Sequence, residues 1–230
     1  MNRSFPGVGM RVSADQFANT IIAAGLSSAE EINAFCSTLP ASTRPKDGET
    51  FANLLVEREK LTRFQAEELL SGSGMPLVLG DYVLLAKIGA GGMGQVFKAH
   101  HRRMKRLAAI KLLAASLTKD EEATRRFERE VEAAAKLSHP HVVQTYDAGV
   151  QRGVWYLVME YVDGRDLAGI VATEGPLSIS RAVDYIRQAA KGLAFAHGKG
   201  VIHRDIKPGN LLVDHEGTVR ILDMGLARFF

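Results

Sequence analysis

The sequence has a single cysteine, Cys36, and this scarcity excludes an internal disulfide. We also expect no secretory signal, because the first residues given, MNRSFPGVGM, contain no apolar core segment. No apolar run within residues 1–230 is long enough to cross a bilayer, so we expect no membrane segment there. A chain without disulfides suits a reducing compartment, and we expect a cytoplasmic protein.

An excess of one charge sign is absent as well. The 29 Lys and Arg residues are scattered and nearly balanced by 26 Asp and Glu, for a net charge of +3. This balance argues against a nucleic-acid partner. A hydrophobic content of 46% in 230 residues is ordinary for a globular protein and predicts one domain of usual size or two small ones.

Residues 1–75 predict a small helical region of unknown role, followed by a linker at 76–80. Two helix starts carry a capping-box pattern, in which Ser precedes Gln or Glu by three positions: Ser13 with Gln16, and Ser28 with Glu31. Thr62 and Gln65 open a further short helix. This region gathers no residues of catalytic type, which favours an interaction or docking module.

From residue 81 the pattern alternates between strands and helices. Strand-like runs surround the glycines of "KIGAGGMGQVF" and recur in "RLAAIKLL", "HVVQTYDAGV" and "VWYLVMEYV". Helices are expected over about 119–137 and 180–197, followed by short strands around "HRDIKPGN" and "ILDMG". One face of the second helix carries Ile179, Ala182, Val183, Ile186, Ala190, Leu193 and His197. The order predicts the α+β class.

A glycine cluster, Gly89, Gly91 and Gly94 with Gly92 as an extra member, spells G-x-G-x-x-G. Glycines let backbone N–H groups approach phosphates without interference from a Cβ. A flexible hairpin turn gives the same pattern. A dinucleotide-binding turn is disfavoured, because there the glycines open a helix and here a strand follows.

Lys111 lies inside an apolar strand, where a lysine needs either an anion or a route to water. Glu128, Glu130 and Glu132, on the helix that follows, are all possible partners by position.

The segment "VIHRDIKPGNLLV" places Asp205, Lys207 and Asn210 in what we expect to be a loop, because Pro208 and Gly209 break a helix. Asp205 supplies a carboxylate, Lys207 a cation and Asn210 an amide oxygen, and Asp223 adds a second carboxylate further along the chain. Such a set is suited to phosphoryl transfer with Mg²⁺. A polar loop with Asx-turns is the alternative for any one of these residues.

Taken in order, these motifs resemble the eukaryotic-type protein kinases, in particular bacterial serine/threonine kinases. The resemblance runs from about residue 81 to the end. It implies a protein-kinase-like fold, with an antiparallel sheet and a C-helix in an N-lobe (81–160) and an incomplete helical C-lobe (161–230). ATP and Mg²⁺ are the implied cofactors, and a protein with Ser or Thr hydroxyls is the implied substrate.

The resemblance also assigns roles. Asp205 is implied as base, Lys207 as a contact of the γ-phosphate, and Lys111, paired with Glu130, as a ligand of the other phosphates. Asn210 and Asp223 are the implied metal ligands. The implied nucleotide contacts are Gly89, Ala90, Gly91, Gly92, Gly94, Val96, Ala109, Met159, Glu160, Val162, Asp166 and Leu212.

Two departures from the family pattern carry expectations. Met224 replaces the phenylalanine of D-F-G, and we expect it to fill the same apolar pocket. No activation segment or A-P-E motif follows Met224 within residues 1–230. We therefore expect residues 1–230 to bind Mg-ATP weakly and to phosphorylate peptides poorly. We also expect the apolar stripe from Ile179 to Leu193 to be partly exposed. A non-catalytic nucleotide-binding or scaffolding kinase fragment is the alternative function. The oligomeric state is not indicated.

Overall fold

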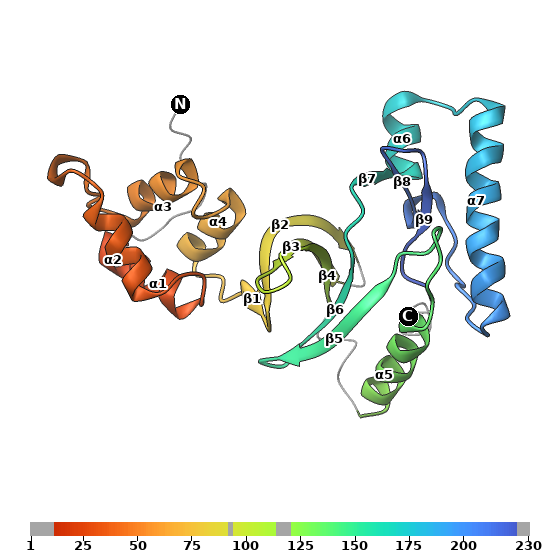
Figure 1. The fold of residues 1–230 in the computed structure, drawn as a ribbon, viewed down its shortest axis with the longest axis horizontal. Helices are drawn as coiled ribbons and strands as arrows, with labels where there is room; N and C mark the ends of the chain where they lie inside the picture. The colour runs from red at the N-terminus through yellow and green to blue at the C-terminus, as the bar shows by residue number, and fades with distance from the viewer. Residues whose placement is uncertain (1–11, 92–93, 114–120, 225–230) are drawn as a thin grey trace. The chain divides into compact units, whose positions relative to one another are not determined.

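The computed structural model describes residues 12–91, 94–113 and 121–224 (Figure 1). They divide into two compact units. The first contains the chain up to Ile88 together with Phe97–Arg106, and the second contains Gly89–Val96 together with the chain from Leu107 onward. Helices and antiparallel strands occur together, which confirms the α+β class.

The first unit is built on short helices. Both expected capping boxes form, at Ser13 and Ser28, and the helix start expected at Thr62 carries a third. The helices are α1 (Ala14–Ala23), α2 (Ala29–Ser37), the 3₁₀ turn η1 (Ala41–Thr43), α3 (Gly48–Glu57) and α4 (Arg63–Ser71). Asp47 caps α3 by accepting from the N–H of Thr50 at 2.8 Å. The core is apolar, with Phe17, Ile21, Phe51, Leu55 and Ala66 almost fully buried.

The segment expected to be a linker carries a short strand, β1 (Val78–Leu79), which pairs with β2 (Tyr82–Gly91) in antiparallel register. Leu77 and Leu79 are 2% and 0% exposed, so this segment joins the hydrophobic core. The side chain of Gln65 donates to the carbonyl of Leu84 on β2 at 2.7 Å. Strand β3 (Gly94–His101) follows the glycine cluster.

The larger sheet has the strand order β1-β2-β3-β4-β6-β5 among the described residues. In the second unit, β4 (Leu107–Leu113), β5 (Thr145–Gln151) and β6 (Val154–Glu160) form its antiparallel end. The register places Ala109 opposite Met159 and Lys111 opposite Leu157. Helix α5 (Glu121–Ala135) falls within the expected helix of 119–137.

A smaller sheet, β7 (Gly164–Asp166), β8 (Leu211–Asp214) and β9 (Val219–Ile221), completes the second unit with α6 (Leu167–Glu174) and α7 (Ile179–Gly198). Helix α7 contacts β9. The "KPGN" segment was expected to be a loop, but Pro208–Asn210 forms a 3₁₀ turn, η3. Proline is compatible with the start of such a turn, because its missing N–H has no partner there in any case.

Two different stripes run along α7. The face toward the core consists of Tyr185, Ala189, Gly192 and Ala196. The stripe singled out in the sequence is largely exposed, with Ile179, Val183 and Ile186 between 60% and 86% exposed, whereas Leu193 at its end packs against the core. Its expected exposure is therefore confirmed. In the part of the chain that the structure describes, no helix combines the length and the apolar character needed to span a membrane.

Candidate functional site

The glycine-rich segment occupies the end of β2 and the start of β3. A Cβ added at Gly91 would meet no atom within 4 Å, whereas one added at Gly94 would lie 1.9 Å from the carbonyl oxygen of Leu112. Gly94 also adopts a φ of 128°, which side-chain-bearing residues avoid. The two glycines therefore differ: Gly91 leaves open space, and Gly94 permits a close approach to β4. Gly92 lies outside the described residues.

A hydrophobic cluster in the second unit unites four of the residues expected to face a nucleotide. Ala109 and Met159 are buried in it, and Val96 and Val162 pack against it. The N–H of Glu160 donates to the carbonyl of Gln144 at 2.9 Å, so this N–H is already used within the protein. This arrangement gives an apolar surface of the kind that accepts a flat ring.

Lys111 is almost completely buried, with a side chain 5% exposed. Its Nζ donates to Oδ2 of Asp223 at 2.7 Å, across 112 positions of sequence. Asp223 adopts a φ of 51°, in the left-handed region that Asp tolerates better than most residues. Glu130 lies half-buried on α5, and its expected pairing with Lys111 stays a prediction.

Asp205 is the centre of a hydrogen-bonded set. Its Oδ2 accepts from Nζ of Lys207 at 2.7 Å and from Nδ2 of Asn210 at 3.1 Å, and Nδ2 also donates to its carbonyl at 2.7 Å. The hydrogen bond from Lys207 is the main cause that lowers the pKa of Asp205 below its ordinary value. Asp205 is therefore ionised at neutral pH, as an acceptor of a proton must be.

The buried His203 ties this loop to the segment that carries Asp223. Its Nε2 lies 2.7 Å from the carbonyl oxygen of Leu222, and its Nδ1 accepts from the N–H of Asp205 at 3.2 Å. The N–H of Leu222 donates to the carbonyl of Asn210 at 2.9 Å. These hydrogen bonds place the Asp205 loop and the segment that carries Asp223 next to each other.

Asp166 and Leu212 are directly opposite each other in the β7–β8 pairing. Oδ1 of Asp166 accepts from the N–H of Gly169 at 2.9 Å and caps α6. The helix cap uses one carboxylate oxygen of Asp166. The expected contact of Asp166 with a ribose stays a prediction.

Arg220 is a residue that sequence reasoning missed. Its Nη1 donates to Oε1 of Glu160 at 2.6 Å, and its Nε lies 3.8 Å from Oδ2 of Asp214. It thereby links β9 to the end of β6, beside the apolar cluster. The only signal in the sequence was an arginine inside a short apolar strand.

The residues present fit a magnesium–nucleotide group. Asn210 uses its amide nitrogen on Asp205, so its side-chain oxygen is the atom suited to a cation. Among the described residues no group of three or more His, Cys, Asp or Glu side chains could hold a metal by itself. Mg²⁺ typically takes one or two protein carboxylates and completes its shell with phosphate oxygens and water, and Asp223 supplies one such carboxylate.

Comparison with known proteins identifies the family. The model of the protein kinase domain matches residues 82–230. A probable serine/threonine-protein kinase of Clostridium perfringens is 43% identical over 152 residues, which cover 66% of this chain and 22% of that protein. PrkC of Bacillus subtilis is 40% identical (65% and 23% covered), and PknB of Mycobacterium tuberculosis is 42% identical (66% and 25% covered). The matched region thus spans about a quarter or less of each relative.

Solved structures agree. The kinase domain of Mycobacterium tuberculosis PknI has a TM-score of 0.58 and 32% identity, and the match covers 64% of this chain and 59% of that one. The expected kinase-like fold is therefore confirmed, and Met224, which is 4% exposed in the core of the second unit, fills an apolar position as expected. The chain belongs to the protein kinase domain family.

Proposed function

We propose that the chain carries the nucleotide-handling part of a serine/threonine protein kinase, which transfers the γ-phosphate of ATP to hydroxyls of a protein substrate. The observation that carries the proposal is the pair of polar sets on adjoining segments, Asp205 with Lys207 and Asn210, and Asp223 with Lys111. The printed names of the relatives support the serine/threonine class.

Each residue has a task in this proposal. The ionised Asp205 accepts the proton of the attacking hydroxyl, and Lys207 steadies negative charge on the transferred phosphate. Lys111 holds the remaining phosphates. Asn210 and Asp223 hold Mg²⁺, which neutralises charge on the phosphate oxygens when it is bound. Because ATP is the phosphate donor, we place the activity in the cytoplasm.

The apolar cluster supplies the adenine contacts in this proposal. Val96, Ala109 and Met159 bury the ring, and the carbonyl of Glu160 together with the backbone of Val162 faces its polar edge. The open space at Gly91 lets backbone N–H groups approach the phosphates.

A thermal-shift titration with Mg-ATP tests binding on the full chain. A ligand that binds only the folded state at 100 times its Kd stabilises that state by about 2.7 kcal/mol. We expect a saturable shift for the wild type and for Lys87→Met, an exposed strand lysine. We expect none for Lys111→Met. Equal shifts for the two lysine variants would contradict the assignment of Lys111.

A second assay separates chemistry from binding. Transfer of radiolabelled phosphate from ATP to dephosphorylated casein is expected to vanish in Asp205→Asn, while the thermal shift with Mg-ATP is kept. Unchanged transfer in Asp205→Asn would refute the role of Asp205. Binding without transfer in the wild type would favour the non-catalytic alternative.

A further inference from the structure

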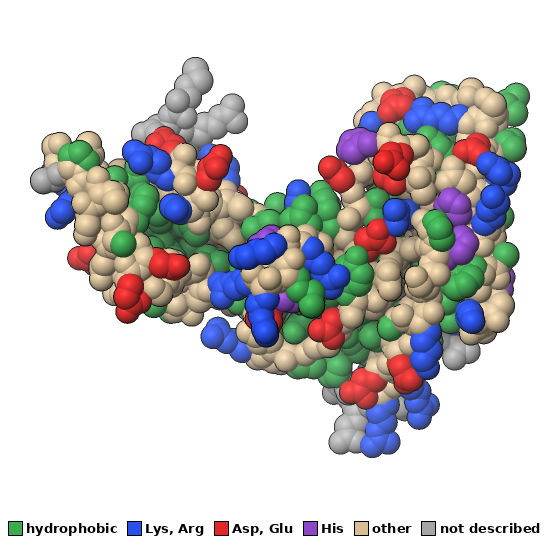
Figure 2. Space-filling model, in the orientation of Figure 1, with side chains coloured by type: hydrophobic (Ala, Val, Ile, Leu, Met, Phe, Trp, Pro, Cys, Tyr) green, Lys and Arg blue, Asp and Glu red, His purple; other side chains and the backbone are tan. Residues whose placement is uncertain are grey.

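The helical unit contains a hollow of about 760 Å³ between α2 and the connection from α3 to α4. Figure 2 shows hydrophobic side chains gathered in this part of the molecule. The apolar lining includes Ile21, Ile32, Phe35, Leu55 and Leu61. Ligand pockets usually measure about 300–1,000 Å³, so the hollow has the size of a small-molecule site.

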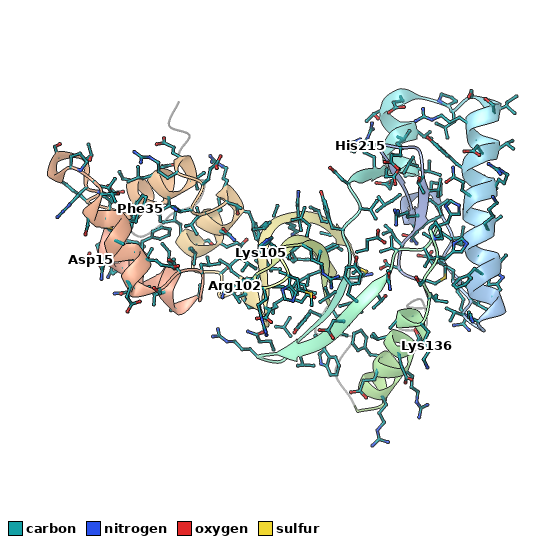
Figure 3. All side chains as sticks on the ribbon, viewed as in Figure 1. Asp15, Phe35, Arg102, Lys105, Lys136 and His215 are labelled. Atoms are coloured by element: carbon teal, nitrogen blue, oxygen red, sulfur yellow. The ribbon has the colours of Figure 1, made fainter. Side chains whose placement is uncertain are left out.

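Most residues of helix α2, beside this hollow, are exposed or half-buried. Ile32 is the only buried residue of its nine. A second hollow of about 440 Å³ is also lined by Ile32, together with Cys36 and Phe51. Phe35 stacks on Phe51 with ring centroids 6.4 Å apart, and its position on α2 is marked in Figure 3. The larger hollow opens to solvent beside the buried side chains of Ile32 and Leu55, so a ligand can reach these apolar groups from outside.

The lining carries more positive than negative side chains. Arg58 and Lys60 are its cations, and Lys60 acts electrostatically on Glu31, the one carboxylate of the lining. The N–H groups of these residues bond to Leu54 and Leu55 in the last turn of α3, at 3.0 and 2.8 Å, which fixes the connection.

The one acidic residue of the lining, Glu31, is already engaged. Its Oε2 accepts from the hydroxyl of Ser27 at 2.7 Å and from the N–H of Ser28 at 2.9 Å, in the capping box of α2. The hydrogen bond from Ser27 is the main cause that lowers the pKa of Glu31. The two cations therefore outnumber a carboxylate whose lone pairs are partly used.

We propose that this hollow binds a small amphipathic anion, an alkyl or aryl carboxylate whose apolar body lies against Ile21, Leu55 and Phe35 and whose acidic group meets Arg58 and Lys60. The apolar lining favours an alkyl or aryl group, and the excess of positive charge favours a negatively charged group at the polar end of the ligand. This site is separate from the residues of the proposed kinase function and does not depend on them.

The test uses octanoate, 1-octanol and octylammonium as probes on the full chain labelled in its Ile, Leu and Val methyl groups. Octanoate is expected to cause saturable NMR shifts at Ile21, Ile32, Leu55 and Leu61. The exposed Ile179 on α7 should not shift, which separates the site from general adsorption to apolar surface. We expect octanoate to bind about tenfold more tightly than 1-octanol, and octylammonium to bind most weakly.

Charge variants give effects of opposite sign. The double variant Arg58→Gln, Lys60→Gln should raise the Kd for octanoate about tenfold or more and leave 1-octanol unchanged. Lys46→Gln, an exposed lysine that does not line the hollow, is the matched control and should change neither.

Glu31→Gln keeps a capping-box residue but removes the negative charge, so it should tighten octanoate binding. An absence of saturable shifts, or equal affinity for the carboxylate and the ammonium probe, would overturn the proposal.

Discussion

Replacing Gly94 with alanine tests whether this glycine serves the sheet as well as a nucleotide. The added Cβ would lie 1.9 Å from the carbonyl oxygen of Leu112, about 1.5 Å short of ordinary contact, which begins at 3.4 Å. The alanine would also have to adopt the φ of 128° found at Gly94, which residues with a side chain avoid, or change the backbone conformation there. Strain of this kind costs about 1–3 kcal/mol, and forced overpacking adds about 1–3 kcal/mol. We therefore expect Gly94→Ala to destabilise the second unit by about 4 kcal/mol.

Urea unfolding followed by tryptophan fluorescence measures this effect. The sequence has one tryptophan, Trp155, which packs edge-on against Phe127 within the second unit and so reports on that unit. With a slope of about 2 kcal/mol per molar urea, the midpoint should fall by about 2 M.

The matched control is Gly91→Ala, where an added Cβ meets nothing within 4 Å. Its midpoint should change by less than the equivalent of about 1 kcal/mol. Equal midpoints for the two variants would refute the close approach of β3 to β4 at Gly94.

Three further predictions concern the second unit. Burial is the main cause that lowers the pKa of His139. The contribution of His139 to the free energy of unfolding is therefore present above its ordinary pKa of about 6.5 and is lost as the pH falls through the lowered pKa. The decrease in unfolding free energy between pH 7 and pH 5, measured by urea unfolding, should be smaller in His139→Gln, and an unchanged decrease would contradict this. A double-mutant cycle of Arg220→Met and Glu160→Gln should give a coupling of about 1–2 kcal/mol, since both side chains are about a quarter exposed; a coupling near zero would show that the pair contributes nothing. Met224→Ala should lower the free energy of unfolding by about 2–4 kcal/mol, because Met224 is only 4% exposed. Met224→Phe should lower it less, and thermal unfolding of both variants measures the difference.

Local rules accounted for much of the fold. The capping boxes at Ser13, Ser28 and Thr62 marked the true starts of α1, α2 and α4, because a capping box joins residues only three positions apart. The β-branched and aromatic runs likewise became β5 and β6. The helical periodicity of α7 was correct, but periodicity cannot say which of two apolar stripes is buried, and the core took the one with Tyr185 and Ala189.

Contacts between distant segments could not be predicted in the same way. The sequence around Arg220 does not predict that its partner is Glu160, which lies 60 positions earlier. The strain and close approach at Gly94 depend on where β4 passes, so a motif that reads as a phosphate loop does not reveal them. The hollow of the helical unit also cannot be predicted from the sequence, because its lining comes from α1, α2, α3 and the connection to α4, which are distant in the chain.

The pairing of Lys111 with Asp223 shows how a site can be stable before its ligand arrives. A lysine whose side chain is only 5% exposed would be costly without an anion, and Asp223, which is 23% exposed, supplies one at 2.7 Å. Under the proposed function Lys111 would hold phosphate oxygens in place of this carboxylate, and Asp223 would hold Mg²⁺ in place of the ammonium. Neither charge is left uncompensated in either state, so binding does not have to meet the full desolvation cost of two bare ions. The same pair therefore stabilises the ligand-free protein and competes with the nucleotide, which makes its strength a determinant of affinity.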